Sequence, residues 1–321
     1  MTRQHIPQTV LDAAHARSAA RAAREWDEAD RLRAEIEAAG WTIVDRGTDF
    51  ALSPVVPADV VDGDRIRYGS SASVPTRWDE PVAGTATIVL VARDTPEPFA
   101  RALAAVLATA PDGTSVVIVA DGPSAEQAGV LEGAPPASDR VEVVWTRERL
   151  GDAAAANIGI RRARGPIVIL LDPAVEPTGD IVSPLVAALE DPTVAITGGR
   201  GTTSTDLRHF APAEPGDVDA IDAGCQAFRR ADAAARGPLD ERFRSRALLA
   251  TWWSLVLRDE GDDVAPRRAV AIADVALSRG GPHADLDPAA GLGPERDPAS
   301  RRDRYRIIDR FGWRRDLLVG G

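Results

Sequence analysis

Four short apolar runs recur between residues 85 and 171, and each has the length of one buried strand. They read TATIVLVA (85–92), SVVIVA (115–120), VEVVW (141–145) and IVILL (167–171). Helical spacing fills the stretches around 97–109 and 151–164. Continuous apolar strands that alternate with helices are typical of a mostly parallel sheet that helices cover. The pattern therefore predicts an α/β domain.

The first 53 residues follow a different pattern. Helical spacing predicts two helices, the first capped by Thr9 and running through Arg24, the second capped by Asp27 and stopped by Gly40. The sequence WTIVDRGTDFAL then alternates around a turn, which predicts a β-hairpin. We expect a small helix-helix-hairpin domain over residues 1–53.

Residues 54–84 are rich in Pro, Gly and Ser and show little sustained periodicity. Such a composition is typical of a linker. We therefore place the α/β domain at residues 85–321, where a loop-like stretch around 279–300 precedes an amphipathic C-terminal helix.

The charge of the chain excludes several functions. Its net charge is −11, and all of its basic side chains except four histidines are arginine. An acidic surface disfavours nucleic acid and anionic lipid as partners. Without lysine, the chain can form neither a GxxxxGK[ST] phosphate loop nor a Schiff base.

The apolar and cysteine content points to a cytoplasmic location. No apolar run approaches the roughly 20 residues of a membrane span, and the N-terminus has no apolar signal core. The single cysteine, Cys225, cannot form an intrachain disulfide, and we expect a buried, inert thiol.

Polar residues follow several of the predicted strands. They are Arg93 and Asp94, then Asp121, then Asp172. Ligands of parallel sheets bind beyond the carboxyl ends of the strands, so these residues mark the expected site. No glycine-rich fingerprint follows the first strand, which disfavours a dinucleotide-binding fold.

An ordered series of motifs resembles the family 2 glycosyltransferases of the GT-A fold, from about residue 85 to 319. The motifs read IVLVARD, VIVADGPS, RLGDAAAANIGIRRARGPIVILLDPAVEP, DAGCQAFRR and GPLDERF. The resemblance implies a GT-A type three-layer sandwich with a mostly parallel sheet. It also implies inverting hexosyl transfer from a UDP- or GDP-linked sugar.

The resemblance places nucleotide binding on four residues. It assigns the base-reading aspartate to Asp121, beside Arg93 and Asp94, and adds Asn157 in the helix DAAAANIGIRRA. Asp121 also precedes Gly122, and Asp-Gly is a common start of a turn. For Asn157, helix packing is the alternative role.

The metal motif of the family departs from its pattern here. The resemblance implies Mg²⁺ or Mn²⁺ on an Asp-x-Asp sequence, but the chain reads Asp172, Pro173, Ala174. Hard cations need several oxygen ligands, so one aspartate is a poor cage. Glu176 is the alternative second ligand, and a divalent cofactor is doubtful.

The catalytic base of the family is also missing from its expected place. The acidic positions fall on Leu249, Ala250 and Trp252, and apolar side chains cannot remove a proton. We expect Trp252 and Trp253 to cover the acceptor pocket. Weak candidates for the base are Asp240 and Glu241, and for a metal or phosphate contact His283.

Residues 20–54 resemble the small C-terminal unit of bacterial cysteinyl-tRNA synthetases. Acids and arginines are interspersed along its helices. The basic stripe that RNA phosphates require is therefore missing, and we expect a packing or oligomerisation role.

Three interpretations of the whole chain stay open. The leading one is a family 2-like protein that binds a nucleotide or nucleotide-diphosphate sugar with weak, altered or absent transfer. The second is an active inverting transferase that uses Asp172 and Glu176 for metal. The third is a non-catalytic protein-interaction module. The sequence does not choose the sugar, nucleobase, acceptor or oligomeric state.

Overall fold

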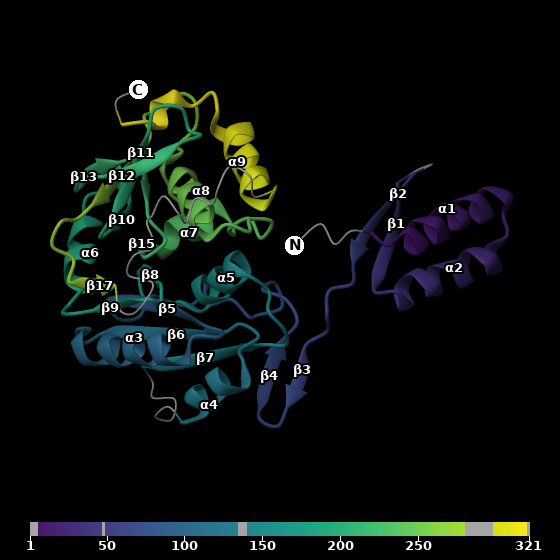
Figure 1. Cartoon of the computed structure of the whole chain (residues 1–321), viewed down its shortest axis with the longest axis horizontal. Coiled ribbons are helices and arrows are strands. Elements are labelled where there is room, and N and C mark those ends of the chain that lie inside the picture. The colour runs from purple at the N-terminus through teal and green to yellow at the C-terminus, as the bar shows by residue number, and fades with distance from the viewer. Residues whose placement is uncertain (1–5, 47–48, 134–139, 280–297, 320–321) are drawn as a thin grey trace. The chain divides into compact units, whose positions relative to one another are not determined.

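The computed structural model describes residues 6–46, 49–133, 140–279 and 298–319. The chain divides into two compact units, Met1–Ala58 and Asp59–Gly321 (Figure 1). Each unit is described here by itself. In the described part of the chain, none of the helices is both long enough and apolar enough to cross a bilayer.

The first unit is a pair of helices followed by a β-hairpin. Its elements are α1 (Gln8–Ala23), α2 (Trp26–Ala38), β1 (Trp41–Arg46) and β2 (Asp49–Pro54). The two strands pair antiparallel, with Ile43 opposite Leu52. Both helices pack onto the hairpin through a small buried cluster that includes Val10, Ile36 and Trp41. This is the predicted combination of helical hairpin and β-hairpin.

Both helices begin before the residues predicted to cap them. Pro7 precedes α1 and its carbonyl accepts a hydrogen bond from Val10, so Thr9 lies inside the first turn. Glu25 likewise precedes α2, and Asp27 lies in its first turn. The proline ring holds φ at −55°, which suits a helix start without a side-chain cap.

The second unit is built on a large twisted sheet. Among the described residues ten strands form it: β3 (Val60–Asp62), β4 (Arg65–Tyr68), β5 (Ala86–Ala92), β6 (Thr114–Ala120), β7 (Val141–Thr146), β8 (Ile167–Leu171), β10 (Val194–Gly198), β13 (Gly216–Val218), β15 (Cys225–Arg229) and β16 (Arg268–Ala271). Their order is β13-β16-β10-β15-β8-β5-β6-β7-β4-β3. The central neighbours β8, β5, β6, β7 and β4 all pair parallel. The predicted α/β class with a mostly parallel sheet is confirmed.

Smaller elements complete this unit. The short strands are β9 (Val175–Pro177), β11 (Gly201–Ser204), β12 (Phe210–Ala213), β14 (Ala220–Ile221) and β17 (Leu277–Arg279). The helices are α3 (Pro96–Thr109), α4 (Ala125–Gly133), α5 (Asp152–Arg162), α6 (Val182–Ala188), α7 (Arg230–Arg236), α8 (Arg246–Arg258) and α9 (Pro298–Phe311), with a 3₁₀ turn at Arg315–Leu317.

The segment predicted as a linker, residues 54–84, contributes two strands to the large sheet. Strand β4 pairs parallel with β7, placing Arg67 opposite Trp145, and β3 pairs antiparallel with β4. These strands are only three and four residues long, VVD and RIRY, so the sequence shows no sustained apolar run for them. The division between the two units falls at Ala58.

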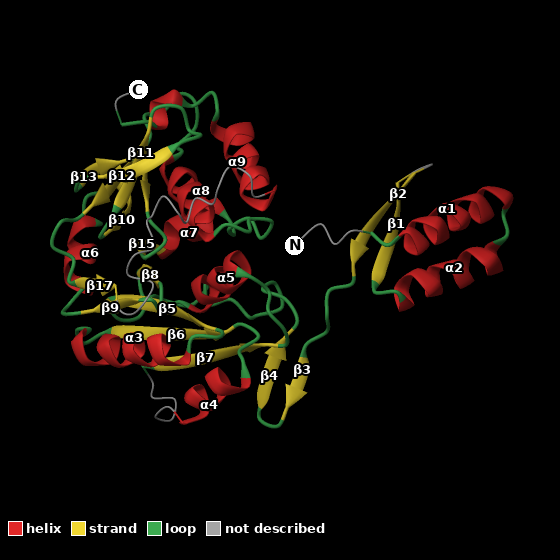
Figure 2. Cartoon of the chain, in the orientation of Figure 1, coloured by secondary structure: helices red, strands yellow, loops and turns green. Residues whose placement is uncertain are grey.

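Helices cover both faces of the central strands (Figure 2). On β5, Val89 packs in the cluster that holds α5 and α8, whereas Ile88 and Leu90 pack in the cluster that holds α3 and α6. This alternation follows from the two-residue period of a strand. The burial is complete, since Ile88 and Leu90 are 0% exposed. Two apolar layers therefore hold the strand ends of the sheet in place.

Burial also explains the single thiol. Cys225 lies on β15 and is buried. Burial, together with the nearby Asp222, raises the pKa of Cys225 to about 12. The thiolate is the reactive form, so this side chain is the inert core residue that was predicted.

The contact between α5 and β5 gives a prediction about packing. A Cβ at Gly159 of α5 would lie 2.2 Å from Cγ1 of Val89. Val89 is β-branched and buried, so it cannot turn away. We expect Gly159→Ala to lower the free energy of unfolding by about 1–3 kcal/mol, measured by urea denaturation.

Gly129 of α4 is the matched control. It is also helical, but a Cβ there meets nothing within 4 Å. Gly129→Ala should raise the free energy of unfolding by roughly 0.5–1 kcal/mol, because alanine loses less backbone entropy. Equal effects of the two substitutions would contradict the packing described here.

Candidate active site

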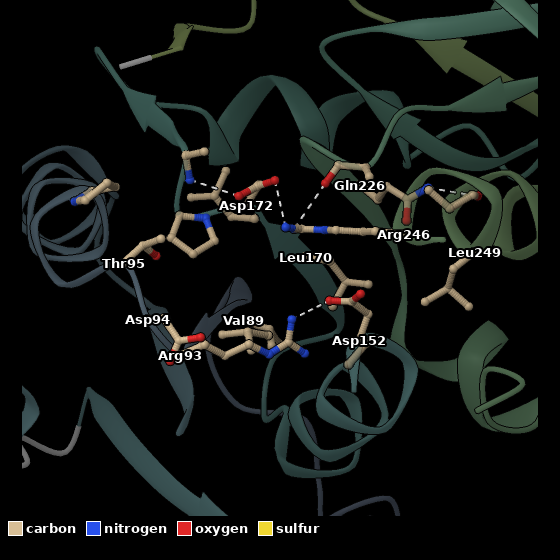
Figure 3. A pocket seen from close by; sticks show the side chains of 18 of the residues that line it. Val89, Arg93, Asp94, Thr95, Asp152, Leu170, Asp172, Gln226, Arg246 and Leu249 are labelled. Carbon is tan, nitrogen blue, oxygen red and sulfur yellow. Dashed lines mark hydrogen bonds and ion pairs between the residues drawn. The ribbon is translucent and has the colours of Figure 1, made fainter. Parts of the chain in front are cut away.

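A cavity of about 590 Å³ opens at the carboxyl ends of β5 and β8 (Figure 3). Its wall includes Val89 and Arg93 from β5 and its end, Asp152 from α5, Asp172 after β8, and Arg246 from α8. This is where a parallel sheet places its ligand site, because both strands point the same way.

Opposite charges line this cavity in equal number. Among the described residues, four arginines line it: Arg93, Arg101, Arg149 and Arg246. Four carboxylates line it as well: Asp94, Glu97, Asp152 and Asp172. Each of the arginines forms an ion pair with a carboxylate, so none of the four points into the cavity as an uncompensated charge.

Both carboxylate oxygens of Asp172 already have partners. Its Oδ1 accepts a hydrogen bond from the backbone N–H of Ala174 at 2.9 Å. Its Oδ2 lies 2.7 Å from Nη1 of Arg246. The first contact fixes the turn after β8, and the second joins that turn to α8. Figure 3 shows the Arg246 guanidinium pointing at Asp172.

Arg246 is held in place from several sides. It is the first residue of α8, and its Nη2 also donates to the carbonyl of Ala223 at 3.3 Å. The preceding N–H groups of Arg244 and Ser245 donate to Oδ2 of Asp303, at 2.7 and 2.8 Å. Asp303 lies on α9 and is fully buried. The start of α8, and with it Arg246, is therefore anchored by a buried carboxylate.

A second ion-pair group lies at the end of β5. Arg93 donates through Nε to Oδ2 of Asp121 at 2.9 Å, and its Nη1 lies 2.5 Å from Oδ1 of Asp152. Burial raises the pKa of Asp152, but the charges of Arg93 and Arg246 outweigh it and hold that pKa below the ordinary 3.8. Asp152 therefore stays ionised at neutral pH and ties Arg93 and Arg246 into one electrostatic group.

Asp121 is enclosed and lies behind the cavity wall. It is 0% exposed and accepts hydrogen bonds from the N–H groups of Leu150 and Gly151, at 2.7 and 3.2 Å, besides the one from Arg93. A nucleobase edge could reach it only after one of these donors left. In this geometry Asp121 orients Arg93. Of the four residues predicted to bind the nucleotide, Arg93 and Asp94 line the cavity.

The predicted metal residues are not brought together as a cation site. Glu176 lies on β9, outside the cavity lining, with its Oε2 3.5 Å from Nε of Arg101. Ala174 provides no ligand, and the described residues contain no cluster of three or more His, Cys, Asp or Glu side chains. With Asp172 bound to a guanidinium, these residues do not fit a divalent ion that needs several oxygens.

The two weak candidates for the base form hydrogen bonds with residues that do not line the cavity. Asp240 accepts hydrogen bonds from Nε of Arg242, and Glu241 accepts them from Asn157 and Ser71. Neither acid lines the cavity. His283 lies outside the described residues.

Asn157 has a structural position. It is 3% exposed and does not line the cavity. Its Oδ1 accepts from the N–H of Leu239 at 2.8 Å, and its Nδ2 donates to the carbonyl of Leu239 at 3.0 Å. Both amide ends thus bind the loop that follows α7 to α5, which is the packing alternative weighed for this residue.

Helix α8 lines the cavity through its first two turns. Arg246, Leu249 and Ala250 line the cavity, in agreement with the i, i+3, i+4 spacing of one helical face. Trp252 packs against Phe243 and Phe311, and Trp253 against Phe228. The two tryptophans do not cover this cavity as expected, because neither lines it. Trp252 lies on another face of α8, whereas Trp253 lies on the same face one turn beyond Leu249 and Ala250 and is buried against Phe228.

A comparison with known protein families finds a match that includes most of the residues of this site. Residues 87–239 match the sequence model of Glycosyl transferase family 2. This stretch is similar in sequence to the glycosyl transferase family 2 domains. It contains β5 to β15 and the loop that Asn157 holds, whereas Arg246 and the rest of α8 lie beyond the matched residues.

Known proteins similar to the chain carry related descriptions. The Succinoglycan biosynthesis protein ExoU of Rhizobium meliloti (strain 1021) is 34% identical over 85 residues, which is 26% of this chain and 25% of that protein. The crystal structure of GalNAc-T7 with UDP, GalNAc and Mn²⁺ gives a TM-score of 0.53 at 16% identity, over 71% of this chain and 48% of that one. A mannosyltransferase from Pyrobaculum calidifontis in complex with GDP-Man and Mn²⁺ gives 0.45 at 16% identity, over 73% and 79%.

The similarities to ExoU and to GalNAc-T7 cover only part of those two proteins. The match spans a quarter of the curated relative and about half of the GalNAc-T7 chain. At 16% identity the GalNAc-T7 likeness shows a shared fold, and it confirms the predicted GT-A architecture of the second unit.

The sequence did not reveal the arginine partners of the site. Arg101, Arg149, Asp152 and Arg246 were not among the predicted residues, although all four line the cavity. One signal was present for Arg246. Arg246 lies three positions before Leu249 and four before Ala250, which are positions where the base was expected. A helix that turns those positions to the cavity also turns Arg246 to it.

The enclosure of Asp121 gives a second prediction. We expect Asp121→Ala to lower the free energy of unfolding by about 3–5 kcal/mol, because it leaves Arg93 with one of its two carboxylate partners and two partly buried N–H groups without this acceptor. Thermal or urea denaturation measures this change. An unchanged stability would contradict the structural role of Asp121.

Asp94→Ala is the control at the same strand end. Asp94 pairs with Arg149, and both side chains are about half exposed, at 53% and 51%. Removing such a pair should change the free energy of unfolding by less than about 1 kcal/mol.

Proposed function

We propose that the second unit binds a nucleotide-diphosphate sugar in the cavity at the ends of β5 and β8, and that it transfers the sugar weakly or not at all. The observation that carries the binding is the group of four arginines around this cavity. Guanidinium groups bind phosphate oxygens in a fork and keep their charge at any physiological pH.

The family match supports the class of ligand. Residues 87–239 match the sequence model of Glycosyl transferase family 2, and the structurally similar GalNAc-T7 was solved with UDP, GalNAc and Mn²⁺. Arg93 and Asp94 are the proposed contacts for the nucleoside part, with Asp121 as the residue that positions Arg93. The sugar and the nucleobase stay open between UDP- and GDP-linked donors.

The proposal of weak transfer rests on the residues that line the cavity where the acceptor would bind. Leu249 and Ala250 face it where the acidic stretch of the family is expected, and neither can accept a proton. Asp240 and Glu241 are held by Arg242 and Asn157 away from the lining. An active transferase that uses Asp172 and Glu176 for metal is less well supported, because both carboxylates are paired with arginine.

Calorimetric titration of the full chain with UDP, GDP and their sugars tests the binding. We expect saturable heat with one nucleotide class. Ala223→Trp should weaken that binding at least tenfold, because Ala223 lines the cavity and an indole would fill it. Ala235→Trp on the exposed side of α7 is the control and should leave the affinity unchanged. No heat with either nucleotide class would refute the proposal.

A donor-hydrolysis assay tests the weak transfer. We expect release of free sugar from the bound donor to stay within about tenfold of the uncatalysed rate, measured with a radiolabelled sugar. Without a group that activates the acceptor, the roughly 10²–10⁴-fold gain of general base catalysis is lost. Rapid release that Asp172→Ala abolishes would show a working catalytic centre and contradict this part of the proposal.

A further inference from the structure

We propose that Arg246 binds the diphosphate of the donor directly, in place of a divalent metal ion. This inference rests on the proposed function, since it concerns how the same cavity holds its ligand. It follows from the position of Arg246 at the start of α8, with its guanidinium against the one carboxylate of the altered metal motif.

The guanidinium occupies the side of Asp172 that a metal would need. Nη1 of Arg246 lies 2.7 Å from Oδ2 of Asp172, while Oδ1 is bound to the N–H of Ala174. A cation approaching Asp172 would first have to expel a fixed positive charge. A divalent cation and a guanidinium at contact distance repel each other strongly, even with the screening near a protein surface. The carboxylate that remains offers too few oxygens to offset that repulsion.

Arg246 is nevertheless free to change partners. Its side chain is 39% exposed and that of Asp172 is 25% exposed, so their ion pair is partly solvated. Such pairs contribute little to stability. Charge-assisted bonds from arginine to phosphate are worth more than this, particularly when two N–H groups bind in parallel. A diphosphate can therefore take Arg246 from Asp172 at small cost.

The surroundings direct Arg246 toward an anion in the cavity. Its Nη2 donates to the carbonyl of Ala223 at 3.3 Å, and Asp303 anchors the two residues before it. Asp303 thus fixes the backbone at the start of α8, while the guanidinium, with Asp172 and the Ala223 carbonyl as its partners, lines the cavity (Figure 3). Arg93 is linked to the same group through Asp152, so two guanidinium groups flank the place of the phosphates.

The first experiment measures affinity for the nucleotide class that binds the full wild-type chain, in EDTA and in excess Mn²⁺. We expect dissociation constants that agree within about twofold. Arg246→Gln should weaken binding in EDTA about 10- to 100-fold, the range of a charge-assisted hydrogen bond. Arg242→Gln is the control, because Arg242 is exposed, pairs with Asp240 and does not line the cavity.

A double variant that removes the guanidinium and adds a carboxylate provides an independent test. In the double variant Arg246→Ala with Ala174→Asp, the guanidinium is gone and a second carboxylate joins Asp172. Mn²⁺ should then tighten nucleotide binding at least tenfold, although it has no such effect on the wild-type chain. Circular dichroism of each variant checks that the fold is retained.

The outcomes separate this inference from the proposed function. If wild type binds the nucleotide only with Mn²⁺, Arg246 does not replace the metal, while the nucleotide site stands. Unchanged affinity of Arg246→Gln in EDTA would also overturn the inference. If wild type binds no nucleotide under either condition, the proposed function itself fails.

Discussion

The ion pair between Asp172 and Arg246 is the interaction on which the character of this site depends. It joins the turn after β8 to the first residue of α8, and it brings positive charge to the place where the family resemblance implies a metal. Because the pair is partly solvated, it adds little to stability. We propose that its consequence is chemical, because it determines which kind of cation can meet a phosphate in the cavity.

The rest of the second unit supports this pair. Two apolar layers fix β5 and β8 side by side, so that Arg93 and Asp172 emerge at the same edge of the sheet. On the opposite wall, Asp303 of α9 holds the residues before Arg246. The charged groups of the cavity thus belong to rigid elements, and a ligand would meet a preorganised set of arginines.

The frame of this domain was predictable because its strands are apolar along their whole length. The run IVILL coincides with β8, and the helices α3 and α5 lie where the spacing places them. Strands β3 and β4 escaped prediction, since they are only three and four residues long and contain no sustained apolar run. The cavity partners escaped it as well, because an ion pair such as Asp172 with Arg246 depends on how distant segments pack. The two tryptophans were misplaced because hydrophobicity alone does not tell whether a side chain of α8 meets the cavity or packs in the core.

One structure determination tests the account most directly. A crystal of the full chain would be soaked with Mn²⁺ and the nucleotide that binds it. The account predicts that the Arg246 guanidinium leaves Asp172 and lies within hydrogen-bond distance of the phosphate oxygens, with no metal between them. A Mn²⁺ ion ligated by Asp172 and the diphosphate, with Arg246 turned away, would contradict it.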